Sequence, residues 1–197
     1  MDRAETQLLI ALGTNQPFER WMPVDLLPEA ARQLALRFGG ALQLSALYRT
    51  PCFPAGAGPD YVNAAAVVTL PHPIAPDQAL QALHEVEALF GRRRITRWDA
   101  RTLDIDLLAM GDAVLPDLAE QARWRNLTPE DQARLTPDRL ILPHPRLQER
   151  AFVLVPLADV AADWRHPVLG LSVAEMLAAL PAGARAEVVR LNPAASV

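Results

Sequence analysis

Two carboxylates that stand two residues apart, Asp104 and Asp106, are the first candidates for chemistry. Leu103, Ile105 and Leu107 alternate with them, which is typical of a strand with one buried face. Two anions side by side on the other face would repel each other, and a hard divalent cation with oxygen ligands would remove that repulsion. The pattern indicates a Mg²⁺ site, with a pair of solvated acidic side chains as the alternative for so short a motif.

A cluster of arginines lies immediately before the two aspartates. The chain has a formal net charge of −4, yet this segment contains Arg92, Arg93, Arg94, Arg97 and Arg101. Guanidinium groups bind phosphate oxygens through paired hydrogen bonds and keep their charge, so the cluster suits a nucleotide triphosphate. A solvated basic loop, or a local nucleic-acid patch around Trp98, is the alternative.

Two further groups of residues suit charged or flat ligands. A Pro-stiffened loop carries His144 and Arg150, which could contact phosphate. Asn63 offers both a donor and an acceptor to a heterocycle. Tyr61 and Phe152 could stack on such a ring, although ordinary core packing explains either residue equally well.

These residues need strands and helices to position them, and the periodicity of the sequence predicts both. Apolar runs predict strands at residues 8–12, 42–48, 61–70 and 103–109, and helical spacing predicts helices at 25–38 and 76–90. Glycines follow both helices and favour their termination. The order β-α-β-β-α-β predicts an α+β fold of the ferredoxin-like type, an antiparallel sheet with helices on one face.

The rest of the chain extends this unit. Residues 115–137 combine charges and prolines with little hydrophobic periodicity, so we expect an insertion or lid with short helical turns near 118–124 and 129–135. A compact segment at 140–150, an apolar stretch at 152–157 and a helix at 172–180 form the expected C-terminal extension. A length of 197 residues favours a single domain, residues 1–197.

Composition argues against several classes of protein. The negative net charge disfavours a general affinity for nucleic acid or anionic membranes, and no apolar stretch approaches the roughly 20 residues of a bilayer span. The single cysteine, Cys52, cannot form an intrachain disulfide, and no basic-then-apolar leader precedes the first strand. We therefore expect a cytoplasmic protein, as a monomer or a weak dimer.

Six sequence blocks, taken together and in order, resemble one known family. They are ALGTN (11–15), YRTP (48–51), YVNA (61–64), GRRRITRW (91–98), RTLDID (101–106) and LPHPRL (142–147). In these blocks and their spacing the chain resembles the 6-hydroxymethyl-7,8-dihydropterin pyrophosphokinase (HPPK) family, from residue 11 to about residue 156. The resemblance implies a transferase of folate biosynthesis that converts ATP and 6-hydroxymethyl-7,8-dihydropterin to AMP and the pterin diphosphate.

The resemblance also implies roles for individual residues. Asp104 and Asp106 would bridge two Mg²⁺ ions on the triphosphate, and Arg92 and Arg101 would join them in catalysis. The positions that match the family's ATP contacts are Glu87, Arg94, Arg97, Leu107, Arg139, His144 and Arg150. The positions that match its pterin contacts are Thr50, Pro51, Phe53, Tyr61, Asn63, Trp98 and Phe152, with Tyr61 and Phe152 stacked on the ring.

One block departs from the family pattern, and two other kinds of protein stay open. The family usually has Arg-Trp-Gly-Pro-Arg, whereas Asp99 and Ala100 replace the Gly-Pro turn here, which alters the backbone before Arg101. No general base stands out, so deprotonation by a Mg²⁺-bound group or by an aspartate stays open.

An inactive pterin- or nucleotide-binding protein would not need both carboxylates. A ferredoxin-like RNA-binding module would carry aromatic residues on its central strands, and residues 8–12 and 103–109 have none.

Overall fold

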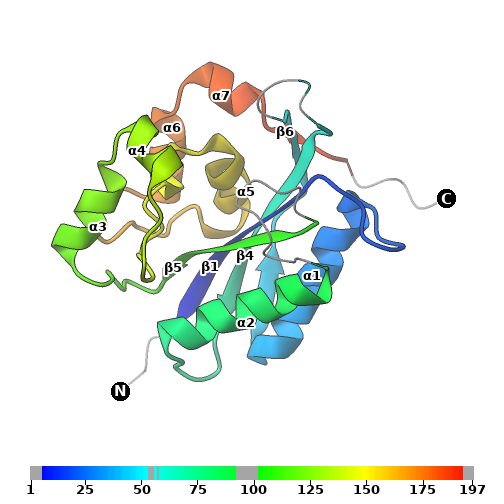
Figure 1. The fold of residues 1–197 in the computed structure, drawn as a ribbon, viewed down its shortest axis with the longest axis horizontal. Coiled ribbons are helices and arrows are strands. Elements are labelled where there is room, and N and C mark those ends of the chain that lie inside the picture. The colour runs from blue at the N-terminus through cyan, green and yellow to red at the C-terminus, as the bar shows by residue number, and fades with distance from the viewer. Residues whose placement is uncertain (1–5, 53–55, 57, 92–101, 193–197) are drawn as a thin grey trace.

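The computed structural model describes residues 6–52, 56, 58–91 and 102–192 (Figure 1). The first half of the chain forms β1 (Gln7–Thr14), α1 (Pro23–Phe38), β2 (Ala41–Leu44), β3 (Tyr48–Thr50), β4 (Tyr61–Thr69), α2 (Pro76–Leu89) and β5 (Asp104–Met110). The second half forms α3 (Leu118–Arg125), α4 (Pro129–Arg134), the 3-10 helix η1 (Leu147–Glu149), α5 (Ala151–Ala161), α6 (Val173–Ala179), α7 (Ala182–Ala186) and β6 (Val189–Arg190).

The strands form one antiparallel sheet in the order β5-β1-β4-β3-β6, with β2 also paired to β4. The predicted α+β fold is confirmed. The single strand expected at 42–48 is divided into β2 and β3, which share one edge of β4 while β1 occupies the other. Between them, the backbone N–H of Ser45 donates to Ala65 O at 2.8 Å, and Ser45 Oγ accepts from Ala65 N at 2.9 Å. The serine hydroxyl thus replaces a backbone carbonyl, so the break leaves this amide of β4 paired.

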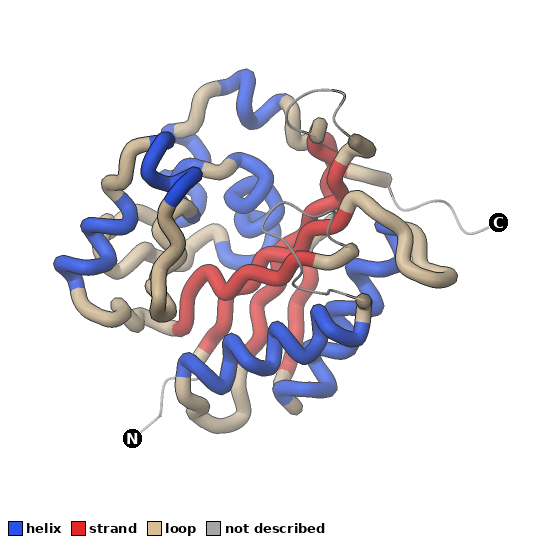
Figure 2. The backbone as a smooth tube through the Cα atoms, in the orientation of Figure 1, coloured by secondary structure: helices blue, strands red, loops and turns tan. Residues whose placement is uncertain are grey.

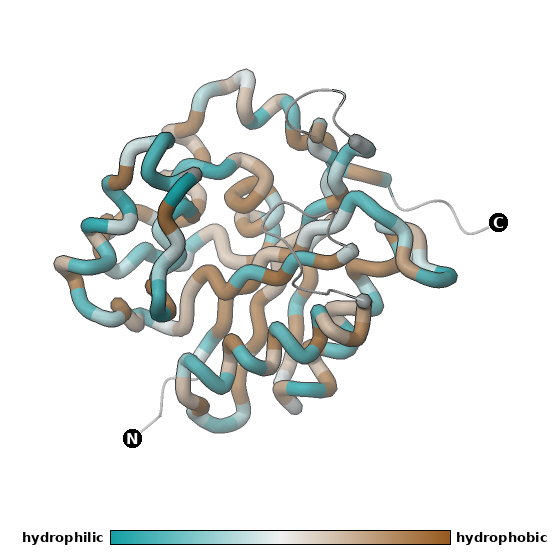
Figure 3. The backbone as a smooth tube through the Cα atoms, in the orientation of Figure 1, coloured by the Kyte–Doolittle hydropathy of each residue, from teal (hydrophilic) through white to brown (hydrophobic). Residues whose placement is uncertain are grey.

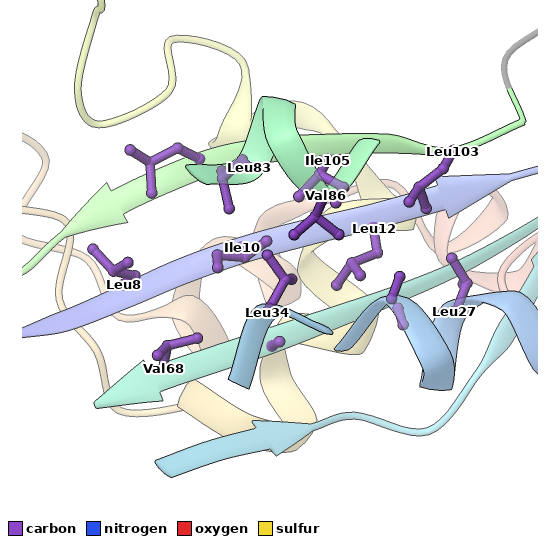
Figure 4. Close-up of a cluster of buried hydrophobic side chains, with 14 of the residues drawn as sticks. Leu8, Ile10, Leu12, Leu27, Leu34, Val68, Leu83, Val86, Leu103 and Ile105 are labelled. Atoms are coloured by element: carbon purple, nitrogen blue, oxygen red, sulfur yellow. The ribbon is translucent and has the colours of Figure 1, made fainter. Parts of the chain in front are cut away.

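Helices α1 and α2 cover one face of the sheet and enclose the larger core (Figures 1 and 4). Helix α1 begins at Pro23 and is capped after Phe38 by Gly39, whose φ of 61° is left-handed and whose N–H donates to Ala35 O at 3.0 Å. Figure 4 shows the side chains that meet between the strands and the two helices, among them Leu8, Ile10, Leu12, Leu27, Leu34, Leu83 and Val86.

Helices α5 and α6 lie against the opposite face, so the helices are not confined to one face as the sequence predicted (Figure 2). Leu9 and Val67 of the sheet pack there against Leu154 and Leu157 of α5. These strands are apolar on both faces, and their second face needs a cover that a two-helix ferredoxin-like unit does not supply. The expected helix at 172–180 is α6, whose cap Ser172 exchanges hydrogen bonds with Glu175 in a capping box.

The two short helices expected within residues 115–137 are present as α3 and α4. Asp117 caps α3, where its Oδ1 accepts from Glu120 N at 2.9 Å, and Thr128 caps α4. The insertion is joined to the following segment by a bridge in which Leu115 N donates to Leu142 O at 2.8 Å.

The hydropathy of the chain follows these layers. In Figure 3 the central strands are mostly brown, whereas α2 alternates between brown and teal as an amphipathic helix does. Within the described ranges, no helix combines the length and the apolar character that crossing a membrane requires.

Candidate functional site

Asp104 and Asp106 lie on the face of β5 that points away from α2. Their neighbours Leu103 and Ile105 are buried in the core under α1 and α2, whereas both aspartates are half-buried. The predicted alternation of faces is confirmed. Further along β5, Leu108 belongs to the core under α5. The two carboxylates therefore lie where the apolar part of this face ends.

Small residues on β1 keep the space beside the carboxylates open. Ala11 is the register partner of Asp106, and Gly13 is the partner of both Asp104 on β5 and Asn63 on β4. Cross-strand partners project to the same face, so Asn63, Gly13 and Asp104 form one row. A Cβ on Gly13 would stand 3.0 Å from Asn63 Oδ1. Because glycine has no side chain, the row has no side-chain atoms between the amide of Asn63 and the carboxylate of Asp104.

Pairing of β3 with β4 brings the predicted pterin residues to the same row. Asn63 is 6% exposed, and its Nδ2 donates to Thr50 Oγ1 at 2.8 Å. This bond fixes the amide and leaves Asn63 Oδ1 as an acceptor. Thr50 is the register partner of the half-buried Tyr61, and Pro51 follows it at an exposed position.

The His144 loop is fixed to β5 next to the aspartates. A register shift between β1 and β5 passes over Leu108, and Leu108 O accepts the backbone N–H of His144 at 2.8 Å. His144 Nδ1 accepts from Arg146 N at 3.1 Å, which leaves Nε2 as the protonated, donating nitrogen of a neutral ring. Burial and the charges of Arg150 and Arg146 lower the pKa of His144 from 6.5 to about 3. The ring is a neutral donor at physiological pH.

Arg150 is a cation whose pKa is affected by both carboxylates. Burial lowers the pKa of its guanidinium, while the negative charges of Asp106 and Asp104 oppose that effect. A guanidinium stays charged throughout the physiological range, so the site combines two acidic groups with a fixed positive charge. The guanidinium carbon also lies 5.6 Å from the ring centroid of Phe152, which stands at the start of α5 and is 41% exposed.

A cavity of about 680 Å³ begins at these charged residues and runs around the edge of β5. Its charged part is lined by Asp106, Arg146 and Arg150, together with the neutral ring of His144. Its other walls come from α2, from β5 and from the segment 124–141, with Leu80, His84, Leu107, Trp124, Leu127, Gln132, Leu135, Arg139 and Leu140 among the lining residues. Its volume lies in the range of small-molecule and cofactor sites, roughly 300–1,000 Å³.

Arg139 and Glu87, which are both predicted ATP contacts, differ in their exposure to solvent. Arg139 lines the cavity with its side chain 61% exposed and pairs with Asp138 at 3.3 Å. Glu87 is only 1% exposed on α2, and its Oε1 accepts from Ile105 N at 2.7 Å. Glu87 therefore holds the strand between the two aspartates in place, and it offers no surface to a nucleotide in this structure.

Six predicted site residues lie outside the described residues: Phe53, Arg92, Arg94, Arg97, Trp98 and Arg101. The described residue that follows the arginine segment is held firmly. Thr102 Oγ1 donates to Phe90 O at 2.5 Å, and Thr102 O accepts from Thr14 Oγ1 at 2.6 Å. These bonds tie the start of β5 to the end of α2 and to the end of β1.

Sequence reasoning missed two features of this region. Arg146 lies within the LPHPRL block, which signalled its neighbourhood, but its place on the cavity wall depends on the turn that His144 Nδ1 holds. Residues 115–137 were predicted only as an insertion or lid, and the part that residues 124–137 take in the cavity wall arises from contacts across long separations.

The described residues contain no group of three or more His, Cys, Asp or Glu side chains that could hold a metal ion. Mg²⁺ commonly binds one or two carboxylates and completes its shell with water and phosphate oxygens. Asp104 and Asp106 therefore fit an ion that binds together with a phosphorylated ligand.

Fold and site define an α+β protein with a nucleotide-sized cavity beside a carboxylate pair at the edge of its sheet. Residues 9–162 match the model of the 7,8-dihydro-6-hydroxymethylpterin-pyrophosphokinase (HPPK) family. The chain belongs to this family, as the six blocks predicted.

Two curated relatives agree with this assignment, and a solved structure shares the fold. The chain is 38% identical over 155 residues to the 2-amino-4-hydroxy-6-hydroxymethyldihydropteridine pyrophosphokinase of Synechocystis sp., covering 78% of this chain and 68% of the relative. It is also 38% identical over 175 residues to the protein of the same name from Pseudomonas aeruginosa, covering 89% and 92%. The fold resembles wild-type Plasmodium falciparum HPPK-DHPS with a TM-score of 0.59 at 16% identity, covering 90% of this chain and 45% of that one. This chain thus spans less than half of the solved protein.

Proposed function

We propose that this protein transfers a pyrophosphoryl group from ATP to 6-hydroxymethyl-7,8-dihydropterin and so makes the pterin diphosphate and AMP for folate synthesis. One observation carries the proposal: Asp104 lies in register with Gly13 and Asn63, on the face that meets the charged part of the cavity. A flat polar ligand on that row and a nucleotide in the cavity would meet at the two carboxylates. Family membership and the names of the relatives support the same reaction.

The pterin would lie over the row formed by β1 and β4. Its edge carries donors and acceptors that match Asn63 Oδ1 and the backbone beside Thr50 and Pro51. Tyr61, on the same face of β4 as Asn63, and Phe152 would supply the aromatic faces that stack on the ring, and Phe152 is 41% exposed. Phe53 and Trp98 remain predicted members of this group.

The triphosphate would extend along the charged part of the cavity. Arg150 and the donating Nε2 of His144 would bind phosphate oxygens, with Arg139 further along the wall. Two Mg²⁺ ions bound by Asp104 and Asp106 would neutralise phosphate charge when the substrate is present. Arg92, Arg94, Arg97 and Arg101 remain predicted phosphate contacts.

Transfer then requires orientation and charge stabilisation more than covalent help from the protein. The hydroxymethyl oxygen attacks the β-phosphorus in line with the bridging oxygen to the α-phosphate. A new O–P bond forms as the old one breaks, AMP leaves with the bonding electrons, and the alcohol proton passes to solvent or to a carboxylate. Arg150 would stabilise the charge that develops on the transferred group.

Incubation of the purified protein with the pterin alcohol, Mg²⁺ and ATP tests the reaction. We expect equimolar AMP and pterin diphosphate, separated by anion-exchange chromatography and identified by mass. Formation of ADP, or of AMP without a pterin product, would overturn the reaction class.

The alternative of an RNA-binding module is not favoured by the arrangement of layers. Such a module uses an open sheet face with aromatic residues on its central strands. Here α5 and α6 cover much of the face that α1 and α2 leave open.

A further inference from the structure

We infer that the insertion, residues 115–137, supplies a wall of the nucleoside-binding part of the cavity and thereby raises the affinity for the nucleotide. This inference rests on the proposed function, because it takes ATP as the ligand. The proposed reaction itself assigns no role to the insertion.

The insertion lines the cavity with side chains that are mainly apolar or uncharged. They are Trp124, Leu127, Gln132, Leu135, Thr136 and Pro137. Leu80 of α2 and Leu140 add to this apolar lining. Charged side chains line the cavity in two places: Asp106, Arg146 and Arg150 at the carboxylate site, and Asp77 of α2 with Asp138 and Arg139 near the insertion. A ligand with a polyanionic chain and a flat ring suits this lining, since phosphates need the cations Arg146 and Arg150 and a base gains from contact with the apolar side chains of the insertion.

The insertion is tied firmly to the segment that carries His144. Gln121 is fully buried, and its Nε2 donates to Pro143 O at 3.2 Å, one residue before His144. The Leu115 and Leu142 bridge adds two backbone bonds, of 2.8 and 3.2 Å. The wall therefore keeps a fixed position relative to the phosphate-binding part, which lowers the ordering cost of binding.

Leu135 and Gln132 have side-chain surface that a ligand would cover. Leu135 is 39% exposed although it lines an apolar part of the cavity. Gln132 Nε2 donates to Leu127 O at 3.0 Å, which orients the amide. Truncation of either side chain changes the wall while leaving the buried contacts of Gln121 and Trp124 intact.

The insertion also offers a matched control. Leu118 is an exposed leucine, 61% accessible, at the first position of α3, and it does not line the cavity. Leu118→Ala thus removes the same atoms from the same insertion without changing the wall.

Calorimetric titration of the full chain with Mg²⁺ and a non-hydrolysable ATP analogue, and in parallel with inorganic tripolyphosphate, tests the inference. We expect Leu135→Ala and Gln132→Ala each to weaken analogue binding about three- to tenfold, from the loss of covered apolar area and polar contact. Tripolyphosphate affinity and the Leu118→Ala variant should stay within about twofold of the parent chain. Circular dichroism verifies that each variant is folded.

Two results would overturn the inference: unchanged analogue binding in both lining variants, or an equal loss of analogue and tripolyphosphate binding. Neither result bears on the transfer reaction, which is read from AMP formation. Conversely, if the chain binds the analogue as expected but makes no pterin diphosphate, the proposed function is wrong while the inference about the insertion stands.

Discussion

At the scale of single residues, the site depends on two acidic side chains, Asp104 and Asp106, which lie on the same face of β5. Asp104 and Asp106 are half-buried, and their negative charges counter the effect of burial on the pKa of Arg150. Ile105 between them is buried, and its amide is held by Glu87. The backbone therefore fixes the carboxylates, and their chemistry can be changed without removing a core contact.

Asp104→Asn and Asp106→Asn test the carboxylates at constant shape. Because each change removes a charge from the site, we expect AMP formation to fall by about 10²–10³. Asp112→Asn, at an exposed position two residues after β5, is the control and should retain full turnover. Near-normal rates in either site variant, measured at saturating Mg²⁺, would refute the metal assignment.

Two histidines give the stability a dependence on acid pH. Burial lowers the pKa of His166 from 6.5 to about 4, and the pKa of His144 falls to about 3. Below pH 6.5 the unfolded chain therefore binds more protons than the folded chain, so the stabilisation present above pH 6.5 is lost as the pH falls toward 4.

His166→Asn tests this dependence. His166 Nδ1 accepts from the amides of Val168 and Leu169, and the asparagine oxygen can replace that acceptor without titrating. We expect the free energy of unfolding to fall less between pH 7.5 and 4.5 in the variant than in the parent chain, by about 1–3 kcal/mol, and Tm to fall less accordingly. An equal fall of Tm in both proteins would contradict the assignment to His166.

At the scale of elements, α5 is anchored to the interrupted edge of the sheet. Tyr48 is 6% exposed, and its hydroxyl donates to Asp159 at 2.9 Å, while the same carboxylate accepts from Ala46 N at 3.1 Å. Burial and the neighbouring carboxylate of Asp159 raise the pKa of Tyr48, which keeps the hydroxyl a donor. This contact joins β3, the gap before it and α5, whose first turn carries Phe152.

Asp159→Ala leaves the Tyr48 hydroxyl and the Ala46 amide without their acceptor. We expect a loss of about 1–3 kcal/mol in the free energy of unfolding, measured in urea. The exposed Asp163, just after α5, provides the control, and Asp163→Ala should change stability by less than about 0.5 kcal/mol. A stability of Asp159→Ala equal to that of the control would show that the contact contributes nothing.

At the scale of the whole molecule, one sheet separates two cores. Strand β1 buries Leu12 against α1 and α2 (Figure 4) and Leu9 against α5 and α6. Neither layer can lose its contacts without exposing a face of β1. The two cores should therefore unfold together.

Leu83→Ala and Leu157→Ala test this coupling from opposite faces. Both leucines are fully buried, one in each core. Each change should cost about 2–5 kcal/mol in unfolding free energy and lower one common transition. Two separate transitions in differential scanning calorimetry would show that the cores are independent.

Much of the scaffold could be predicted from local pattern. The alternation at 103–107 and the helices at 25–38 and 76–90 follow from hydrophobic period and from the glycines that end the helices, and all are present. The two short helices expected in the insertion are also present, although that segment has little periodicity. The division of β2 from β3 could not be predicted, because it depends on the pairing of Ser45 with Ala65, a contact across 20 residues. The position of α5 and α6 likewise depends on contacts between distant segments. An apolar helix indicates burial, but not which face of the sheet it covers.

The sequence by itself determined the family, the order of the elements and the types of residue that could bind metal, phosphate and a flat ring. Only the tertiary structure decided that Asn63, Gly13 and Asp104 form one row, that Glu87 is a buried support, and that the insertion borders the cavity. The physical reason is that strand register, helix docking and loop anchoring depend on contacts between distant segments. Local periodicity fixes which side of an element is buried, but the partner that buries it is chosen by the whole chain.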